Sequence, residues 1–387
     1  MWALVHRLKY LLGQTCAIRH PSYDYSDEDR FNFFCLLQQM TDAVKPNKED
    51  NNQLRNGGDP SSSTSRGSRS NSTLTSKDMV AFSSRLIAAA RAMESRRQDR
   101  LFDDPFAETL AGDEAMMMVE EYRNERMEKY TKSLPSCATA GDDDGTSPQL
   151  SERRLAIRTR FCDDFFEDCA LSKGIKQIVL VGAGMDTRGL RLKAGAGTKV
   201  FEVDQASVLR AKKELLSEAA RMRVEGTRRA QVISVEADLS ASGWEGELFK
   251  GGFDGEAPSA WIIEGLTMYL EQLELVELLR VVAGLCVPGS ALCSTFVSAA
   301  SVQRAASSDS SLMSTWKFGS DDPVSFVAAV FPEGWWFEGV TCGTPGSYPE
   351  GADYNVGFEG KAAPYVVGNF GETPPCGGEV NAKNHEL

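Results

Sequence analysis

The sequence predicts an α/β protein built on a doubly wound, mostly parallel sheet, and three observations support this fold class. Short apolar runs rich in β-branched residues alternate with helical segments from residue 177 onward. The first run ends in the turn Gly182-Ala183-Gly184, as a strand does where it enters a ligand-holding loop. Acidic residues follow the next three runs. Such a sheet carries helices on both faces and binds its ligand at the carboxyl ends of its strands.

The predicted fold does not include the first part of the chain. Residues 1–45 form an N-terminal extension that is either a short helix or a targeting segment, since no acid precedes Asp24. Residues 46–77 are rich in Ser, Asn and Gly and nearly free of apolar residues, so we expect a disordered linker. At the other end, we expect residues 373–387 to be a flexible tail.

A helical cap is predicted over residues 78–175. Its segments are helices at 79–95, 103–122 and 151–174, with a loop at 133–148. Ser151 is the expected cap of the last helix, and Gly174 is expected to close it.

The ligand-binding core is predicted over residues 176–372. Its expected strands are 177–182, 198–204, 231–236, 259–264 and 290–297, and its expected helices are 186–192, 206–222 and 271–286. Residues 324–370 are expected to add two edge strands.

Composition argues against several classes of function. The formal net charge of −13 is unfavourable for a nucleic-acid binder, which needs a basic face. The nine cysteines include no CxxC pair, so we expect no metal site and a reducing, cytoplasmic location. No stretch is long and apolar enough for a membrane span, so we expect no membrane partner.

The histidines are confined to the ends of the chain. They are His6, His20 and His385, so the predicted globular body holds none. Catalysis by a Ser-His-Asp or Cys-His arrangement is therefore not expected.

The strand ends hold the candidate ligand-binding residues. Asp204 lies 22 positions after Gly182, close to the spacing of roughly 20 residues at which an acid binds a ribose diol. Asp238 and Glu264 follow the third and fourth strands. Taken singly, each residue also fits a local role, as a helix cap for Asp204 and Asp238 or as a solvated loop acid for Glu264. Their shared register at one sheet edge favours a common site.

The glycine turn indicates the kind of nucleoside. Thr187 stands where a dinucleotide fingerprint has its third glycine, and Asp186 lies at the start of the following helix, where it would repel a pyrophosphate. A cationic nucleoside without phosphate suits this acidic edge, and S-adenosyl-L-methionine is such a ligand. An NAD(P)-dependent oxidoreductase and a catalytically inactive cofactor-binding protein are the alternatives.

Several motifs resemble one family. "VLVGAGMDTRGLRL", "VFEVDQASVLRAKKELL" and "WIIEGLTMYL" occur in order, preceded by "AARAMESRRQDRLFDDPFAETLAG" and "IRTRFCDDFF". Together they resemble the leucine carboxyl methyltransferase family, in particular its bacterial-type branch of S-adenosylmethionine-dependent O-methyltransferases. The resemblance runs from about Met79 to Val297, and more loosely to about residue 370. It implies a class I methyltransferase (Rossmann-like) fold with an N-terminal helical addition over the cofactor.

The resemblance also implies roles for individual residues. In this family an arginine binds the methionine carboxylate of the cofactor. Arg160 matches this arginine best and Arg158 is the second candidate, although Arg158 could instead pair with acids of its own helix. The other cofactor-binding residues implied are Gly182, Gly184, Asp186, Asp204, Asp238, Leu239 and Glu264.

Two of these motif residues have open alternatives. Asp186 could hold the cofactor ammonium, while Arg188 could pair with acids of neighbouring loops. Tyr269 is a candidate substrate contact, or an aromatic side chain packed under a loop.

The expected reaction is methylation of a carboxylate or acidic hydroxyl, on a small molecule or a protein C-terminus. A carboxylate is already ionised at neutral pH and needs no general base, which agrees with a globular body without histidine. The N-terminal helices and C-terminal insertions, which shape the substrate pocket in this family, depart from the family pattern, so the sequence does not identify the acceptor.

Overall fold

A computed structural model describes residues 76–133, 149–216, 230–307, 315–340 and 365–371. The predicted extension 1–45, the tail 373–387 and nearly all of the linker 46–77 and the loop 133–148 lie outside the described residues.

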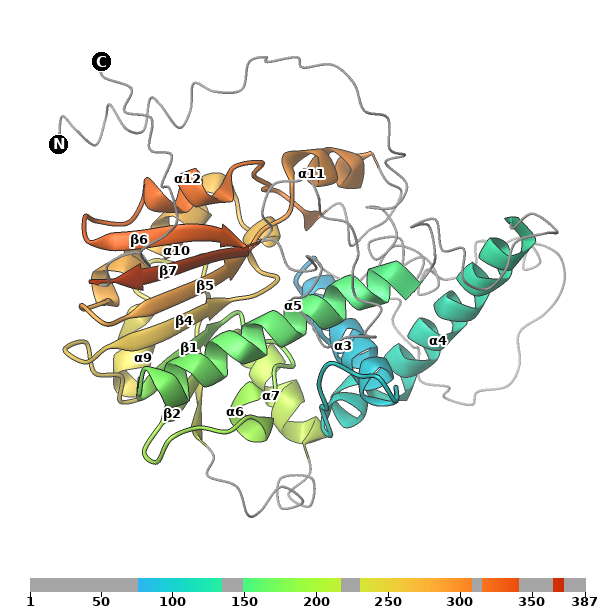
Figure 1. Ribbon diagram of the computed structural model, residues 1–387, viewed down its shortest axis with the longest axis horizontal. Helices are drawn as coiled ribbons and strands as arrows, with labels where there is room; N and C mark the ends of the chain where they lie inside the picture. The colour runs from blue at the N-terminus through green and yellow to red at the C-terminus, as the bar shows by residue number, and fades with distance from the viewer. Residues whose placement is uncertain (1–75, 134–148, 217–229, 308–314, 341–364, 372–387) are drawn as a thin grey trace, which may run out of the picture.

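A seven-stranded sheet forms the centre of the molecule (Figure 1), in the order β3-β2-β1-β4-β5-β7-β6. The strands are β1 (Gln177–Val181), β2 (Lys199–Asp204), β3 (Gln231–Glu236), β4 (Ser259–Ile263), β5 (Ala291–Thr295), β6 (Trp335–Val340) and β7 (Tyr365–Phe370). The first five are parallel, and β7 runs antiparallel to β5 and to β6. The class I methyltransferase fold is confirmed, including the two strands added at the end of the chain.

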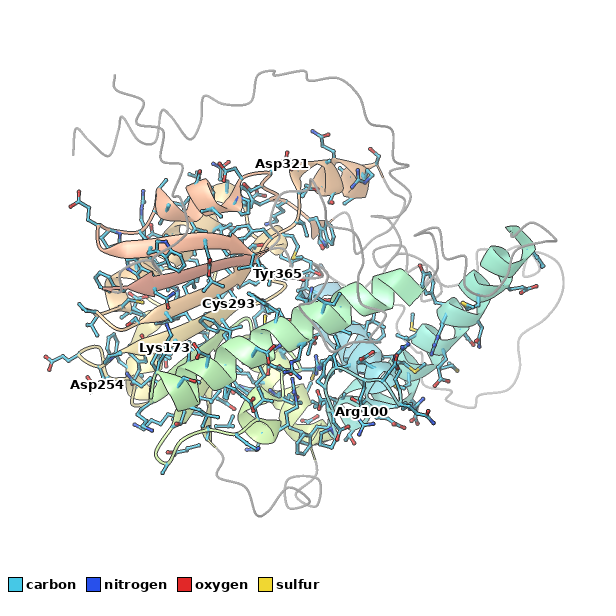
Figure 2. The ribbon with its side chains drawn as sticks, in the orientation of Figure 1. Arg100, Lys173, Asp254, Cys293, Asp321 and Tyr365 are labelled. Carbon is cyan, nitrogen blue, oxygen red and sulfur yellow. The ribbon has the colours of Figure 1, made fainter. Side chains whose placement is uncertain are left out.

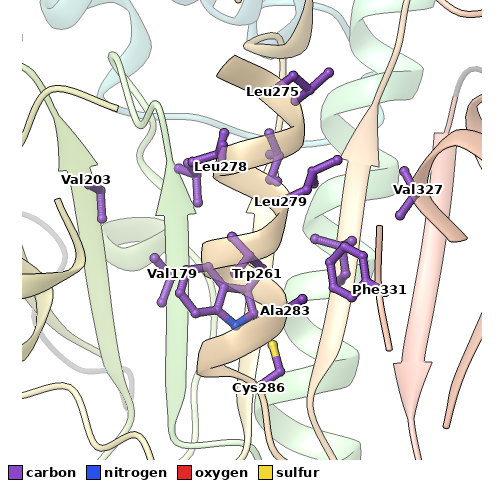
Figure 3. Packing of buried hydrophobic residues seen from close by; sticks show 14 of the residues in the cluster. Val179, Val203, Trp261, Leu275, Leu278, Leu279, Ala283, Cys286, Val327 and Phe331 are labelled. Atoms are coloured by element: carbon purple, nitrogen blue, oxygen red, sulfur yellow. The ribbon is translucent and has the colours of Figure 1, made fainter. Parts of the chain in front are cut away.

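Both faces of the sheet are apolar and covered. Alternate residues of β1 point to opposite faces, as the twofold period of a strand requires. Val179 and Val181 pack in one core cluster with helix α10 (Gln272–Leu285), in which the Trp261 indole of β4 is fully buried (Figure 3).

The opposite face packs against helix α5 (Gln149–Glu167). Ile178 and Leu180 of β1 share its core cluster. Cys293 of β5 faces this helix (Figure 2), with its sulfur 4.0 Å from Cys162 Sγ. A short π-helical turn (Asp168–Ser172) follows α5 and leads to Gly174, whose φ of +69° ends the segment as predicted.

The helical cap has a core of its own. Helices α3 (Ser76–Ser95) and α4 (Ala107–Ser133) pack along each other beside the sheet (Figure 1). Gly112 interrupts α4 with a φ of +69°, and Arg85 Nε of α3 donates to the Ala111 carbonyl next to this break at 2.9 Å. Met185 joins the cap cluster from the turn after β1. The cap is therefore packed directly onto the glycine turn.

Several helix boundaries differ from the prediction. Helix α4 begins at Ala107 and extends to Ser133, and α5 begins at Gln149, so Ser151 lies inside α5 and is not its cap. Within the core, α6 (Arg188–Arg191) and α7 (Ala206–Leu215) match predicted helices. The short helices α9 (Glu245–Lys250), α11 (Ala299–Ala306) and α12 (Pro323–Ala328) were not predicted. Within the described ranges, none of the helices combines the length and apolar character that a bilayer crossing requires.

Candidate functional site

A cavity of about 530 Å³ lies at the carboxyl ends of the parallel strands. Its walls come from the turn after β1, the ends of β2, β3 and β4, helix α3 of the cap, and residues 315–317. Ligand sites of proteins typically measure roughly 300–1,000 Å³ and occupy this edge of an α/β sheet. The cavity is therefore of a size and in a place suited to a small molecule.

The glycine turn forms the floor of the cavity. Gly182 and Gly184 adopt φ values of +70° and +48°, in the left-handed region that favours glycine. A Cβ atom on Gly184 would lie 3.0 Å from Cβ of Ser84 in α3. The backbone of the turn thus lies close against the cap helix.

Asp204 is tied to this turn. Its Oδ2 accepts a hydrogen bond from the Gly184 N–H at 2.7 Å, and its Oδ1 accepts one from the Gln205 N–H at 2.7 Å. Burial raises the pKa of Asp204 above its ordinary value, and these two hydrogen bonds only partly oppose the effect. The helix-cap alternative does not apply, because the N-cap of α7 is Gln205.

Asp238 and Leu239 line the cavity after β3. The Asp238 Oδ1 accepts hydrogen bonds from Ser240, at 3.1 Å from its N–H and 2.6 Å from its hydroxyl. Asp238 therefore stabilises a local turn and also lies on the cavity wall.

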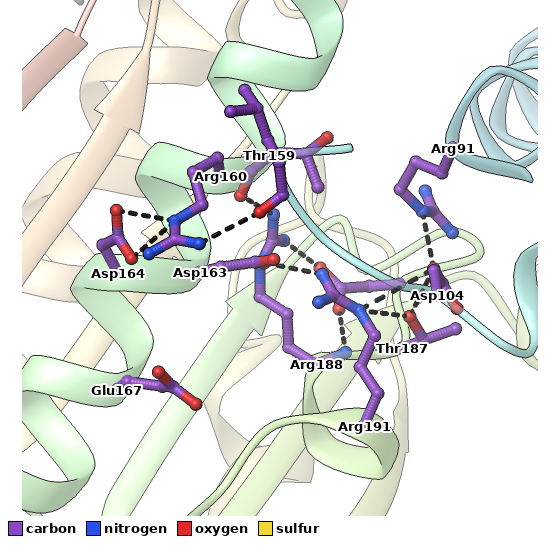
Figure 4. A network of polar contacts seen from close by, with 12 residues as sticks. Arg91, Asp104, Thr159, Arg160, Asp163, Asp164, Glu167, Thr187, Arg188 and Arg191 are labelled. Carbon is purple, nitrogen blue, oxygen red and sulfur yellow. Dashed lines mark hydrogen bonds and ion pairs between the residues drawn. The ribbon is translucent and has the colours of Figure 1, made fainter. Parts of the chain in front are cut away.

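Arg188 is the centre of a buried ion-pair network (Figure 4), and its side chain is only 3% exposed. Its Nε lies 2.7 Å from Oδ1 of Asp163, and its Nη2 lies 2.7 Å from Oε2 of Glu264. Its Nη1 pairs with Asp186 Oδ2, and its N–H donates to Asp186 Oδ1. Both oxygens of Asp186 are thus engaged by Arg188, which supports the structural alternative for this arginine.

The network continues to the cap through Arg191 and Asp104 (Figure 4). Arg191 Nη2 lies 2.6 Å from Asp163 Oδ1, and Arg191 Nε lies 3.7 Å from Asp104 Oδ2. Asp104 also pairs with Arg91 of α3 at 2.9 Å and accepts a hydrogen bond from Thr187 Oγ1 at 2.7 Å. Thr187 and Arg188 of the "DTR" motif therefore join the cap to the core, and Asp186 holds Arg188 in place.

The network is electrically balanced. Its arginines are Arg91, Arg158, Arg188 and Arg191, and its acids are Asp104, Asp163, Asp186 and Glu264. Burial alone would raise the pKa of Asp186 and Glu264, but the surrounding positive charges, that of Arg188 first among them, together hold both pKa values below normal. These acids therefore stay ionised beside the cavity.

The two arginines of the "RTR" run lie in different surroundings. Arg158 lines the cavity, and its Nε lies 2.8 Å from Oε1 of Glu264. Arg160 is 44% exposed, pairs with Asp164 of its own helix at 2.9 Å and donates to the Leu101 carbonyl at 3.0 Å (Figure 4). The geometry of the cavity thus favours Arg158 over the predicted Arg160, because Arg160 makes the intrahelical pair that the sequence allows for Arg158.

Tyr269 lies on the cavity wall in a 3₁₀ turn (Thr267–Tyr269) after β4. Burial raises the pKa of its hydroxyl, and side-chain hydrogen bonds with Ser83 of the cap and with Trp316 oppose that shift. Tyr269 therefore connects the cap, the end of β4 and the segment 315–317 at one end of the cavity.

Sequence reasoning missed part of the site. Ser83, Ser84 and Arg91 reach the cavity from α3, and Trp316 and Lys317 reach it from the other side. Arg191 also lines the cavity and was missed. For this residue a local signal was present, since Arg191 follows Arg188 at a spacing that places both on one side of a helical turn.

Comparison with known proteins identifies relatives of the chain. The model of the leucine carboxyl methyltransferase family matches residues 84–283. A protein of Mycolicibacterium smegmatis is 35% identical over 211 residues, which cover 54% of this chain and 64% of that relative. One of Mycobacterium sp. (strain KMS) is 34% identical over 223 residues, covering 58% and 68%. Both carry the provisional name of S-adenosyl-L-methionine-dependent methyltransferase.

Solved structures with a related shape are more distant in sequence. A DUF574 family protein from Streptomyces avermitilis is 16% identical, with a TM-score of 0.39 over 64% of this chain and 96% of its own. Human N-acetylserotonin methyltransferase in complex with SAM is 11% identical, with a TM-score of 0.35 over 70% of this chain and 72% of its own.

Proposed function

The chain belongs to the leucine carboxyl methyltransferase family, and on this premise we propose that it is an S-adenosylmethionine-dependent methyltransferase acting on a carboxylate. The observation that carries the proposal is the cavity, which is lined by Asp204, the glycine turn and the Arg158–Glu264 ion pair.

The proposed cofactor position follows from the donor and acceptor groups of the wall. Each oxygen of Asp204 accepts one backbone hydrogen bond and retains acceptor capacity for a ribose hydroxyl. The glycine turn lines the cavity beside Asp204, and Asp238 and Leu239 would border the adenine. The same groups fit a nucleoside without a pyrophosphate.

The pair Arg158–Glu264 suits the amino-acid end of the cofactor. Both side chains line the cavity and remain partly exposed, at 18% and 13%. The guanidinium matches a carboxylate and the glutamate matches an ammonium, so a zwitterion can replace the internal pair with both charges still paired. Arg188 continues to neutralise Glu264 during this exchange.

When bound, S-adenosylmethionine supplies a methyl group on a positively charged sulfur. An acceptor carboxylate oxygen forms the O–CH₃ bond with a lone pair while the C–S bond breaks and its electrons stay on sulfur. No proton moves, so the chain has to align the acceptor and exclude water, effects worth about 7–11 kcal/mol in well-oriented systems. An acidic hydroxyl is the second acceptor class that fits this chemistry.

The balanced ion network has a role in this reaction. The attacking carboxylate loses its charge in the transition state, so an unpaired cation beside it would stabilise the ground state more than the transition state. Each cavity-lining arginine of the network already has a carboxylate partner at 2.6–2.9 Å. The acceptor is thus left to interact chiefly with the sulfonium.

Replacing Asp204 tests the proposed cofactor site. We expect Asp204→Ala to weaken binding of S-adenosylhomocysteine by about 1–3 kcal/mol, or roughly 5- to 150-fold, because the ribose diol loses its acceptor. Titration calorimetry measures the effect. Glu236→Ala is the matched control, since Glu236 ends the adjacent strand β3 but lies outside the cavity wall and pairs with Arg210 on the surface. Equal affinities of both variants would contradict the site.

The NAD(P)-dependent alternative is tested in the same titrations. Asp186 is held ionised at the start of α6, where a pyrophosphate would have to approach. We therefore expect binding of S-adenosylhomocysteine and none of NADH, and the reverse result would support an oxidoreductase.

A further inference from the structure

We propose that Lys317 binds a second anionic group of the acceptor, so that the preferred substrates are dicarboxylic acids. This inference rests on the proposed function and names its substrate class. It starts from three cavity-lining residues that lie together, Tyr269, Trp316 and Lys317.

The backbone holds Lys317 at this end. Its N–H donates to the Met268 carbonyl at 2.7 Å, which joins the segment 315–317 to the turn that carries Tyr269. The neighbouring Trp316 is buried in a small cluster with Met268 and Ala305. The lysine side chain therefore extends from a fixed wall.

Lys317 differs from the other cavity-lining cations that the structure describes. Each of the four arginines has a carboxylate oxygen within 2.9 Å, as given above. The Lys317 Nζ is 3.6 Å from Glu271 Oε1 and 3.7 Å from Glu274 Oε2, beyond hydrogen-bond distance, and its side chain is 41% exposed. An ammonium has three donors, so an incoming anion can accept a hydrogen bond here without displacing an existing one.

The two glutamates have another function. They form the capping box of α10, in which Glu274 Oε2 accepts from the Glu271 N–H at 2.7 Å. Their charges also oppose an anion near Lys317. Lys317 supplies the attraction for an anionic group of the acceptor. Neutralising Glu274, which lines the cavity, should therefore strengthen binding of that group.

The chemistry of methyl transfer explains why Lys317 should bind a second carboxylate of the acceptor and not the carboxylate that is methylated. The reacting carboxylate must be neutralised as the O–CH₃ bond forms and the S–CH₃ bond breaks, so strong pairing there would slow the reaction. A second carboxylate keeps its charge throughout. Its ion pair with Lys317 can therefore contribute to binding and alignment without raising the barrier.

A matched panel of acids tests the substrate class. Succinate, adipate and suberate are compared with butyrate, hexanoate and octanoate, and with 6-aminohexanoate, by methyl-ester formation from labelled S-adenosylmethionine using the full chain. We expect the best dicarboxylate to exceed its monocarboxylate in kcat/KM by about tenfold or more, mostly through KM.

Variants of Lys317 assign the preference to this side chain. Lys317→Ala should abolish the preference, Lys317→Arg should retain it, and Lys317→Glu should shift it toward 6-aminohexanoate. Glu274→Gln should increase it. Thermal unfolding and S-adenosylhomocysteine affinity should be unchanged in Lys317→Ala and Lys317→Arg, since at most long, exposed ion pairs are lost.

The outcomes separate the two proposals. Equal use of mono- and dicarboxylates, or a preference that survives Lys317→Ala, overturns the role of Lys317 and leaves the methyltransferase proposal intact. Tight binding of S-adenosylhomocysteine with no ester from any acid overturns the carboxylate acceptor itself, and the Lys317 subsite with it.

Discussion

At the residue scale, the "RTR" run shows what the sequence can and cannot decide. Residues two apart on a helix point about 200° apart, so only one of Arg158 and Arg160 can face the cavity. The deciding signal was present in the sequence. Arg160 has an acid at i+4, Asp164, whereas the residue at i+4 from Arg158 is Cys162. The arginine without a partner on its own helix is the one that lies at the cavity.

The two arginines predict a contrast in cofactor binding. Arg158→Gln should raise the Kd for S-adenosylhomocysteine about tenfold or more, because a charged hydrogen-bond partner of the ligand carboxylate is lost. Arg160→Gln removes an exposed i,i+4 pair worth about 0.3–0.5 kcal/mol and should leave the Kd within about twofold. Calorimetry on both variants measures this. A larger loss in Arg160→Gln would restore the original preference.

Arg188 predicts a change in the pH dependence of stability. In the wild type, the lowered pKa values of Asp186 and Glu264 stabilise the fold above their ordinary values of 3.8 and 4.5, and this stability is lost as the pH falls through the lowered values. Arg188→Met removes the largest of the opposing charges while burial remains, so both pKa values should rise and less stability should be lost as the pH falls. Urea unfolding between pH 4 and 8 should show about 3–5 kcal/mol of destabilisation at pH 7.

A surface arginine provides the control for this experiment. Arg280→Met breaks only an exposed pair with Glu277 at 3.5 Å and should change stability by under about 1 kcal/mol at every pH. Parallel pH profiles for Arg188→Met and the wild type would mean that Arg188 does not control the ionisation of these acids.

At the element scale, the strands were predictable and the short helices were not. The central strands are short, mostly apolar runs with turn residues near their ends, and β1 and β4 are rich in β-branched residues, so the pattern identifies them directly. Helices α9 and α11 have six and eight residues, too few for a 3.6-residue period to appear in the sequence. The break at Gly112 was also missed, because its compensating donor, Arg85, comes from a different helix.

The contact between the glycine turn and the cap predicts a coupled effect. Gly184→Ala places a side chain at φ +48° and 3.0 Å from Ser84 Cβ. It should destabilise the protein by about 1–2 kcal/mol through the backbone alone and weaken cofactor binding further by displacing α3. Adding Ser84→Gly should restore part of the cofactor affinity, while the destabilisation caused by the left-handed backbone at residue 184 should remain. A double-mutant cycle on Tm and Kd measures this, and strictly additive effects would show that the turn and the cap are not coupled.

At the scale of the whole molecule, the site forms between parts that are distant in the chain. The bonds that join the cap and α5 to the strand ends link residues 83 positions apart for Asp104 and Thr187, and 106 apart for Arg158 and Glu264. Periodicity and spacing describe single elements, so they predicted the sheet edge and its acids. They could not predict which cap residues would complete the cavity, because that depends on how α3 packs across the turn.

The distribution of histidine over the whole chain predicts the pH profile of activity. His6, His20 and His385 all lie outside the described residues, and a carboxylate acceptor, with a pKa of about 4, needs no base. Replacing all three histidines by Gln should keep kcat within about twofold and leave it flat from pH 6 to 8.5. On the acid side, protonation of Asp204, whose pKa is raised by burial, should weaken cofactor binding first, so the decline should appear in KM for S-adenosylmethionine before kcat. A fall in kcat below about pH 6.5 that disappears in the triple variant would instead identify a histidine base from the ends of the chain. That result would favour a hydroxyl acceptor over a carboxylate.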